Sequence, residues 1–303
     1  MNIEKITSKH KDLIQKMLEK KFEVYKSSFI NVPVGRVEIE SFVKSIIEND
    51  GYIANDGETF GFISMTYKGE LFYSRQGLYH AEWAHYLPSN DRVKTTLLEA
   101  CYKYMETHDL KDHTFSFLAN RKDLEKFFFD ASYGSRCVDA HSIIDSSFAA
   151  SDSHIRIAVD DDIEKLIPLL DEHHVYMNEV VRLGMNFSDS CELLKEWLSD
   201  DSISILVYED EEIKGMMMLV HEASGGCRTA SDDKTLGIET TQVSEKYQGE
   251  GIGLKLLKYA HRYGTDKGFK YLAVDFESFN FAAYKFWSKY FTLTMKSVIR
   301  NIG

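Results

Sequence analysis

Hydrophobic and polar positions along this chain follow two periods, about 3.6 residues in some segments and two residues in others, which predict helices and strands respectively. In the second half of the chain the strand-like segments are 154–159, 203–208, 213–222, 234–243, 270–276 and 292–300. The helix-like segments of that half are 162–179, 189–199, 252–266 and 280–289. The pattern therefore predicts a mixture of helices and strands without long unstructured stretches.

The first half repeats this order. Its strand-like segments are 2–7, 51–55, 59–67, 77–86, 113–119 and 136–144, and its helix-like segments are 9–27, 36–48, 92–107 and 121–131. Marker residues keep a nearly constant offset, since Leu97 corresponds to Leu256 and Phe128 to Trp287. Such an offset indicates duplication. A length of 303 residues also suits two domains of about 100–150 residues, and we expect them at 1–150 and 151–303.

A glycine-spaced segment follows the predicted strand that ends at Val243. Gly249, Gly251 and Gly253 allow close approach of the backbone to a ligand, and an apolar helical face begins at Leu254. Free N–H groups at such a helix N-terminus stabilise a phosphate through hydrogen bonds and the helix dipole. The spacing is G-x-G-x-G, which fits neither the G-x-G-x-x-G dinucleotide fingerprint nor the P-loop.

Two separated motifs in the second half resemble those of the GNAT superfamily, the acyl-CoA-dependent N-acyltransferases. The segment 248–253 matches the pattern Gln/Arg-x-x-Gly-x-Gly/Ala, and the second signature is matched in order by Asn280, Ala283, Phe286, Trp287 and Lys289. The resemblance covers roughly residues 153 to 303. It implies tandem GNAT-like α/β domains, each with a central, mostly antiparallel, twisted mixed sheet flanked by helices.

The first half is expected to be a degenerate copy. Where its phosphate loop should lie, the segment 86–94 contains no glycine, and Pro88 lacks an amide donor. We therefore expect pyrophosphate binding in the second half alone.

The resemblance also implies acetyl-CoA as the acyl donor and a set of residues that bind it. Backbone amides of the glycine segment would hold the pyrophosphate, and the pantetheine arm would lie along the edge of the preceding strand, with Asp275 and Phe276 across the gap. The cofactor-binding residues are then Gln242, Val243, Gln248, Gly249, Glu250, Gly251, Ile252, Gly253 and Asn280. Asn280 is equally suited to cap a helix, and the two roles are compatible.

Direct acetyl transfer also needs a base for the amine proton and an acid for the departing thiolate. Glu239 is the predicted base, because strand alternation would place it on one side with Thr241 and Val243, although an acidic strand residue often faces solvent. Glu277 and His221 are alternative bases.

The predicted acid departs from the family pattern. The position at which many members place a Tyr holds Trp287, and an indole N–H does not usefully transfer a proton. Tyr284 lies one turn earlier and is the candidate acid, with solvent as the alternative.

Composition narrows the kinds of partner and the location that we expect for this protein. A net charge of −12 argues against nucleic-acid binding and leaves cationic amines open as substrates, although an acidic surface also serves solubility. No run approaches the roughly 20 apolar residues of a membrane span, and the first residues lack signal-peptide features, so a cytoplasmic protein without membrane contact is expected. The cysteines, which are Cys101, Cys137, Cys191 and Cys227, are scattered, so we expect reduced thiols and no metal.

The expected function is N-acetyl transfer from acetyl-CoA to a primary amine of a small molecule or peptide. The alternative is a non-catalytic acyl-CoA-binding module that senses or scaffolds. The sequence leaves open the acceptor, an acyl group larger than acetyl, the role of the first half, and the oligomeric state, a homodimer included.

Overall fold

The computed structural model describes residues 1–29, 38–71, 75–184, 186–221 and 232–302. In the first half the helices are a 3₁₀ turn at Ser8–His10, α1 (Lys11–Ser28), α2 (Ile39–Glu48), α3 (Asp91–Thr107) and α4 (Lys122–Asp130). Its strands are β1 (Asn2–Lys5), β2 (Gly51–Asn55), β3 (Phe60–Ser64), β4 (Tyr67–Leu71), β5 (Arg75–His80), β6 (His85–Tyr86), β7 (Asp112–Leu118) and β8 (Gly134–Ile143).

The second half has the same kinds of element. Its helices are 3₁₀ turns at Asp160–Asp162 and Glu245–Tyr247, α5 (Ile163–Val175), a π-helical turn at Tyr176–Val180, α6 (Ser190–Ser199), α7 (Ile252–Lys267) and α8 (Phe281–Trp287). Its strands are β9 (Ile155–Ile157), β10 (Ile203–Asp210), β11 (Glu212–Val220), β12 (Thr235–Val243), β13 (Tyr271–Glu277) and β14 (Thr292–Asn301). The predicted order of helices and strands is confirmed here.

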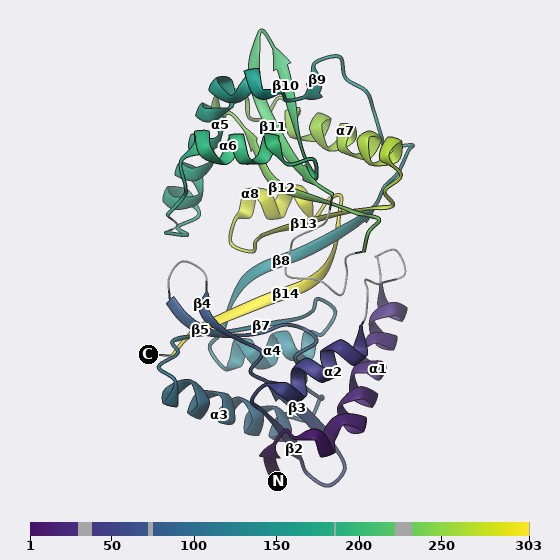
Figure 1. The fold of residues 1–303 in the computed structure, drawn as a ribbon, viewed down its shortest axis with the longest axis vertical. Coiled ribbons are helices and arrows are strands. Elements are labelled where there is room, and N and C mark those ends of the chain that lie inside the picture. The colour runs from purple at the N-terminus through teal and green to yellow at the C-terminus, as the bar shows by residue number, and fades with distance from the viewer. Residues whose placement is uncertain (30–37, 72–74, 185, 222–231, 303) are drawn as a thin grey trace.

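One ten-stranded mixed sheet runs through both halves of the protein (Figure 1). Its strand order is β4-β5-β7-β14-β8-β13-β12-β11-β10-β9, and a separate sheet has the order β1-β2-β3-β6. The β5–β7 and β12–β13 pairs are parallel, and the other pairs are antiparallel. The mixed α/β architecture is as predicted, but a separate complete sheet in each half is not.

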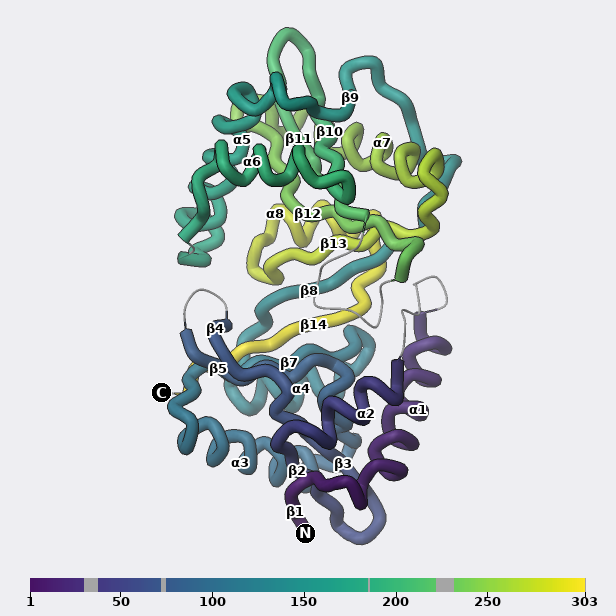
Figure 2. Tube along the Cα trace, in the orientation of Figure 1, coloured from purple at the N-terminus to yellow at the C-terminus, as the bar shows by residue number. Residues whose placement is uncertain are grey.

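The two halves exchange their last strands. The C-terminal strand β14 lies between β7 and β8 and pairs Val298 with Phe115, while β8 pairs with β13. Burial follows the exchange, because Val298 belongs to the core that contains Phe115, and Val138 on β8 belongs to the core of the second half. In Figure 2 the yellow C-terminal strand accordingly runs into the body formed by the purple and blue segments.

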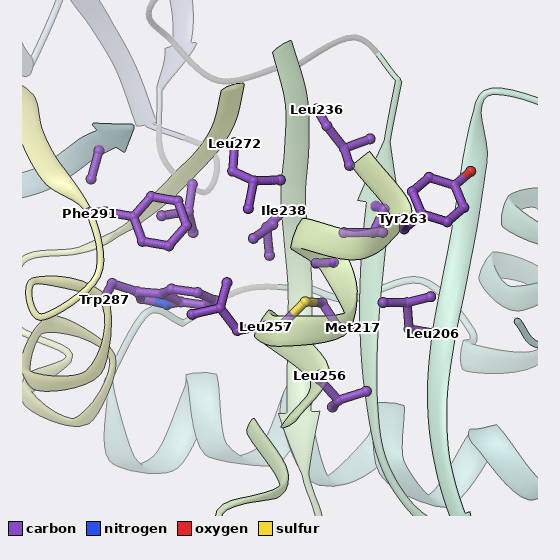
Figure 3. Close-up of a cluster of buried hydrophobic side chains, with 14 of the residues drawn as sticks. Leu206, Met217, Leu236, Ile238, Leu256, Leu257, Tyr263, Leu272, Trp287 and Phe291 are labelled. Carbon is purple, nitrogen blue, oxygen red and sulfur yellow. The ribbon is translucent and has the colours of Figure 1, made fainter. Parts of the chain in front are cut away.

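Helices cover both faces of the sheet in the second half. On one face α7 and α8 pack on β12 and β13, where Leu257, Ile238 and Trp287 belong to a continuous apolar cluster (Figure 3). On the other face α5 and α6 pack through Leu166, Leu194 and neighbouring side chains. The junction between β12 and β13 therefore lies between two layers of packed helices.

The largest local difference from the predicted elements is at 77–86. This segment is two strands, β5 and β6, separated by a turn in which the Ala84 N–H donates to the Ala81 carbonyl. The short strand β4 was not predicted at all.

No helix among the described residues is long and apolar enough to cross a membrane. The described cysteines, which are Cys101, Cys137 and Cys191, are free thiols, and Cys227 lies outside the described residues.

Candidate functional site

Strands β12 and β13 diverge in the middle of the sheet. They pair in parallel from Thr235↔Tyr271 to Ile238↔Val274, and the pairing ends there. The segment from Glu239 to Val243 therefore no longer faces a hydrogen-bonded neighbour on β13. This opening is the splay that the sequence predicted between these strands.

The glycine segment connects the open part of β12 to helix α7. Gly249 and Gly251 have φ angles of 88° and 80°, in the left-handed region that glycine adopts without strain, and Gly251 is the N-cap of α7. The first helical hydrogen bond runs from the Lys255 N–H to the Gly251 carbonyl. The N–H groups of Ile252 and Gly253 precede it, so they have no acceptor within the helix. Such amides suit a phosphate.

A cavity of about 280 Å³ lies at the splay, beside the start of α7. Its lining residues are Tyr176, Thr241, Gln242, Val243, Gln248, Gly253, Asn280, Ala282, Ala283, Phe286 and Trp287. Five of the residues predicted to bind the cofactor line it, namely Gln242, Val243, Gln248, Gly253 and Asn280. The others, Gly249, Glu250, Gly251 and Ile252, are in the adjoining turn and helix start.

Asn280 is both a helix cap and a cavity residue. Its Oδ1 accepts hydrogen bonds from the Ala283 N–H at 3.1 Å and from the Tyr176 hydroxyl at 2.9 Å. The amide N–H₂ group of Asn280 is thereby left as the donor that can reach a ligand. Burial raises the pKa of Tyr176 above its usual value, so this hydroxyl is protonated at neutral pH. Sequence patterns contain no signal that links residues so far apart.

The tyrosine predicted as the acid does not line this cavity. Tyr284 packs its ring edge-on against Phe276 with centroids 5.7 Å apart, and it is absent from the residues that line the 280 Å³ cavity. Trp287 lines that cavity and is 6% exposed. Tyr176 is thus the tyrosine that the fold places in the cavity.

Strand β12 carries a bulge at the predicted base. Ile238 pairs with Leu219 and Thr241 with Met217, so β12 has one more residue than β11 between these positions. The bulge interrupts the strand alternation from which the sequence predicted a shared face for Glu239, Thr241 and Val243. The charge of Glu239 acts on Asp275.

Asp275 is the strongly perturbed carboxyl group at the splay. It follows Val274, the last residue of β13 that pairs with β12. Its side chain is exposed to solvent at the surface, although many protein atoms surround it at longer range. Desolvation and, secondarily, the charge of Glu239 raise the pKa of Asp275 to about 6.

The alternative bases are engaged in other contacts. Glu277 forms an ion pair with Arg136, and both side chains are largely buried. His221 Nε2 lies 3.0 Å from the Tyr263 hydroxyl. Glu239 and Asp275 are therefore the carboxylates at the end of the paired region.

In the first half, the N-terminus of α3 corresponds to that of α7, and the side chain of its N-cap residue occupies an amide that would otherwise be free. Asn90 caps α3, and its Oδ1 accepts a hydrogen bond from the Val93 N–H at 3.2 Å. Lys94 also pairs with Asp91 in this turn. These contacts occupy the positions at which the second half presents glycine amides.

A buried histidine pair lies in the first half. The ligand atoms of His80, Cys101 and His113 all lie within 4.8 Å of one another, a grouping that the sequence did not predict. His80 Nδ1 lies 2.9 Å from the Ser64 carbonyl, the two Nε2 atoms are 3.0 Å apart, and His113 Nδ1 lies 2.6 Å from the Tyr133 hydroxyl. One choice of tautomers satisfies this entire chain with hydrogen bonds.

Comparison with known families agrees with this geometry. Residues 169–291 match the model of the acetyltransferase (GNAT) family. Residues 169–291 are thus similar to the GNAT superfamily, whose members are generally acyltransferases that use acetyl-CoA. No curated protein sequence matches the chain.

Solved structures show the same fold over nearly the full length. A GCN5-related N-acetyltransferase from Sphaerobacter thermophilus is 11% identical, with a TM-score of 0.61, over 99% of this chain and 95% of that one. The GCN5-related glucosamine N-acetyltransferase region of a fungal multi-domain GH3 β-N-acetylglucosaminidase is 10% identical, with a TM-score of 0.56, over 99% of this chain and 38% of that one. At such identities the likeness concerns the fold alone.

Proposed function

We propose that this protein is an acetyl-CoA-dependent N-acetyltransferase that acylates a primary amine of a small molecule or peptide by direct attack. The observation that carries the proposal is the cavity at the β12–β13 splay, which adjoins the open amides at the start of α7. A phosphate-binding helix start beside an unpaired strand edge suits a long ligand with a phosphate at one end and an amide-bearing arm at the other.

The residues present fit acetyl-CoA. The segment Gln248, Gly249, Glu250, Gly251, Ile252 and Gly253 would hold the pyrophosphate through its amides. Gln242 and Val243 would pair with the pantetheine arm, and the amide N–H₂ of Asn280 would donate to it. Acetyl-CoA supplies the thioester carbonyl and the thiolate leaving group.

The chemistry requires two proton transfers in the protein. The amine nitrogen forms a bond to the acetyl carbon, the carbon–sulfur bond breaks, the amine proton passes to a base, and the sulfur receives a proton. We assign Glu239 as the base, with Asp275 beside it, because these carboxylates follow the last paired residues of β12 and β13. The sequence motif makes Tyr284 the candidate acid. Tyr176 is the second candidate, because its side chain lines the cavity.

We further propose that residues 1–150 and 151–303 are the two GNAT-like units, and that only the second binds acetyl-CoA. The capped α3 start in the first unit supports this division of roles.

Calorimetry with acetyl-CoA on the full chain tests the proposal. The expected result is one site per chain and, with an amine present, release of free thiol. Absence of acetyl-CoA binding would overturn the proposal, two equal sites would overturn the role given to the first unit, and binding without amine-dependent thiol release would establish the sensor alternative instead.

A further inference from the structure

Two aspartates face each other across the strands that join the two halves. Asp139 on β8 lies directly opposite Asp275 on β13. Their neighbours Val138, Ala140 and Val274 pack into the core beneath α7 and α8, so by strand alternation both carboxylates project from the other face of the sheet. Directly opposed side chains have Cβ atoms about 5 Å apart, and like charges at that separation repel.

Asp139 is nine-tenths buried, and no basic side chain of the described residues forms an ion pair with it. It is 7% exposed, and no hydrogen bond reaches its carboxylate among the described residues. On its other side β14 places Met295 opposite it, and Met295 packs with Tyr25 and Phe29. A polar group so placed needs a partner, because burial of an unpaired carboxylate is strongly unfavourable.

The charged and titratable groups around Asp139 are mainly acidic. Burial, then the charges of Asp275 and Glu82, raise the pKa of Asp139 well above its usual value. The thiol of Cys137 on the same face lies 3.7 Å from Asp275 Oδ2, and Glu239 acts on Asp275 from β12.

The basic groups on β8 have other contacts. His141, also on this face, lies 2.8 Å from the Thr294 hydroxyl through its Nδ1. Arg136 is paired with Glu277. The carboxylates of both halves therefore form an acidic site that begins where the splay ends.

We propose that the acceptor is a diamine or polyamine, with one amino group beside Glu239 for acetylation and a second ammonium group bound between Asp139 and Asp275. This inference rests on the proposed function, since Glu239 and Asp275 directly follow Ile238 and Val274, the last paired residues beside the cavity. A divalent cation suits the site less well, because hard cations take about six or more oxygen ligands and Met295 closes one side.

Calorimetry on the full chain with 1,4-diaminobutane and n-butylamine tests the inference, since these probes share a carbon chain and differ by one amino group. The expected result is that the diamine binds at least about tenfold more tightly. Asp139→Asn should abolish this advantage. Asp201→Asn, which removes one negative charge from an exposed turn, should retain it.

A second measurement on the unaltered protein does not depend on the folding of a variant. Repulsion between two opposed carboxylates keeps one of them protonated, and an ammonium group that binds between them displaces that proton. Titrations near pH 6.5 in buffers of different ionisation enthalpy should show proton release with the diamine and much less with butylamine.

Four outcomes would overturn the inference. They are equal affinity for the two amines, a diamine advantage that survives Asp139→Asn, equal proton release with the two amines, and displacement of the diamine by millimolar Mg²⁺. These results differ from failure of the proposed function. If acetyl-CoA binds and both amines give equal thiol release, the enzyme assignment stands and only the diamine inference fails. If acetyl-CoA does not bind but the diamine still does, the enzyme assignment fails and the diamine-binding site remains.

Discussion

Gly251 and Gly253 differ in what an added methyl group would do. Gly251 has φ 80°, a conformation that is about 1–2 kcal/mol unfavourable for other residues, so Gly251→Ala should lower the free energy of unfolding by about that amount. It should also weaken acetyl-CoA binding by shifting the amides.

Gly253→Ala is the matched control for stability. Its Cβ would lie 3.7 Å from Phe286, an ordinary contact, and alanine favours a helix, so its stability should be unchanged or higher. Urea titrations of both variants measure this difference, and equal destabilisation would contradict it.

Tyr176 and Tyr284 can be separated by paired substitutions. If the acid is Tyr176, Tyr176→Phe should lower kcat about 100-fold, a typical contribution of acid catalysis, while Tyr284→Phe should leave it nearly unchanged. Initial rates of thiol release at saturating acetyl-CoA measure this. A larger loss in Tyr284→Phe would restore the assignment based on the sequence motif.

The residues that the sequence predicted for cofactor binding lie together in the structure, whereas those predicted for catalysis are more scattered. Glycine spacing and the Asn280 motif are local, and the residues they indicate line the cavity or its entrance. The orientation of Glu239 depends on a bulge, and the bulge depends on how β12 pairs with β11. The Tyr176–Asn280 contact depends on the π-helical turn after α5, which the helical period of 162–179 does not reveal.

Helix α5 begins at an ion pair that makes its stability sensitive to acid. Asp162 accepts hydrogen bonds from Arg156 at 2.6 and 2.9 Å and from the Val159 N–H at 3.0 Å, and these lower its pKa to about 2. Because the folded-state pKa is below the unfolded value, the stabilisation is complete above pH 4 and is lost as pH falls toward 2.

Asp162→Asn should therefore lower the free energy of unfolding by about 2 kcal/mol at pH 7 and by much less near pH 2. Asp161→Asn, at an exposed position of the same turn, is the control and should have little effect. Urea unfolding at both pH values measures the difference. An equal effect of Asp162→Asn at pH 7 and pH 2 would show that its ionised form is not what stabilises α5.

Most helices and strands were predictable because each buries one face. The exception β4 is exposed at most positions, so Tyr67–Leu71 has no hydrophobic alternation to detect. The break between β5 and β6 was hidden because the turn between them, from Ala81 to Ala84, contains no glycine or proline to mark it.

The exchanged strands should make the two halves unfold together. Phe128→Ala removes a fully buried side chain from the first core, which should cost about 3–5 kcal/mol. In a Trp83→Phe background, only Trp197 and Trp287 of the second half report fluorescence. Their unfolding midpoint should nevertheless fall in Phe128→Ala, because β14 joins both cores.

Phe129→Ala is the neighbouring control, since Phe129 is 77% exposed, and it should leave that midpoint in place. A midpoint that does not respond to Phe128→Ala would show that the halves unfold independently.

The exchange itself could not be predicted from sequence patterns. β8 and β14 occupy equivalent places in the two repeats. Each alternates apolar and polar residues in a way that suits the strands of either half. Val138 and Val298 would each be buried with or without the exchange, so only the three-dimensional pairing decides between the two arrangements.

The position of β14 also sets the order in which a nascent chain can complete its cores. Protein domains generally fold from the N-terminal end as they leave the ribosome. Here β7 gains its second neighbour only when residues 292–301, which follow the other strands and helices of the second half, have emerged. The N-terminal half, although made first, therefore reaches its final state only after the second half has been synthesised, and its unpaired strand edge is the segment that a ribosome-associated chaperone would need to shield.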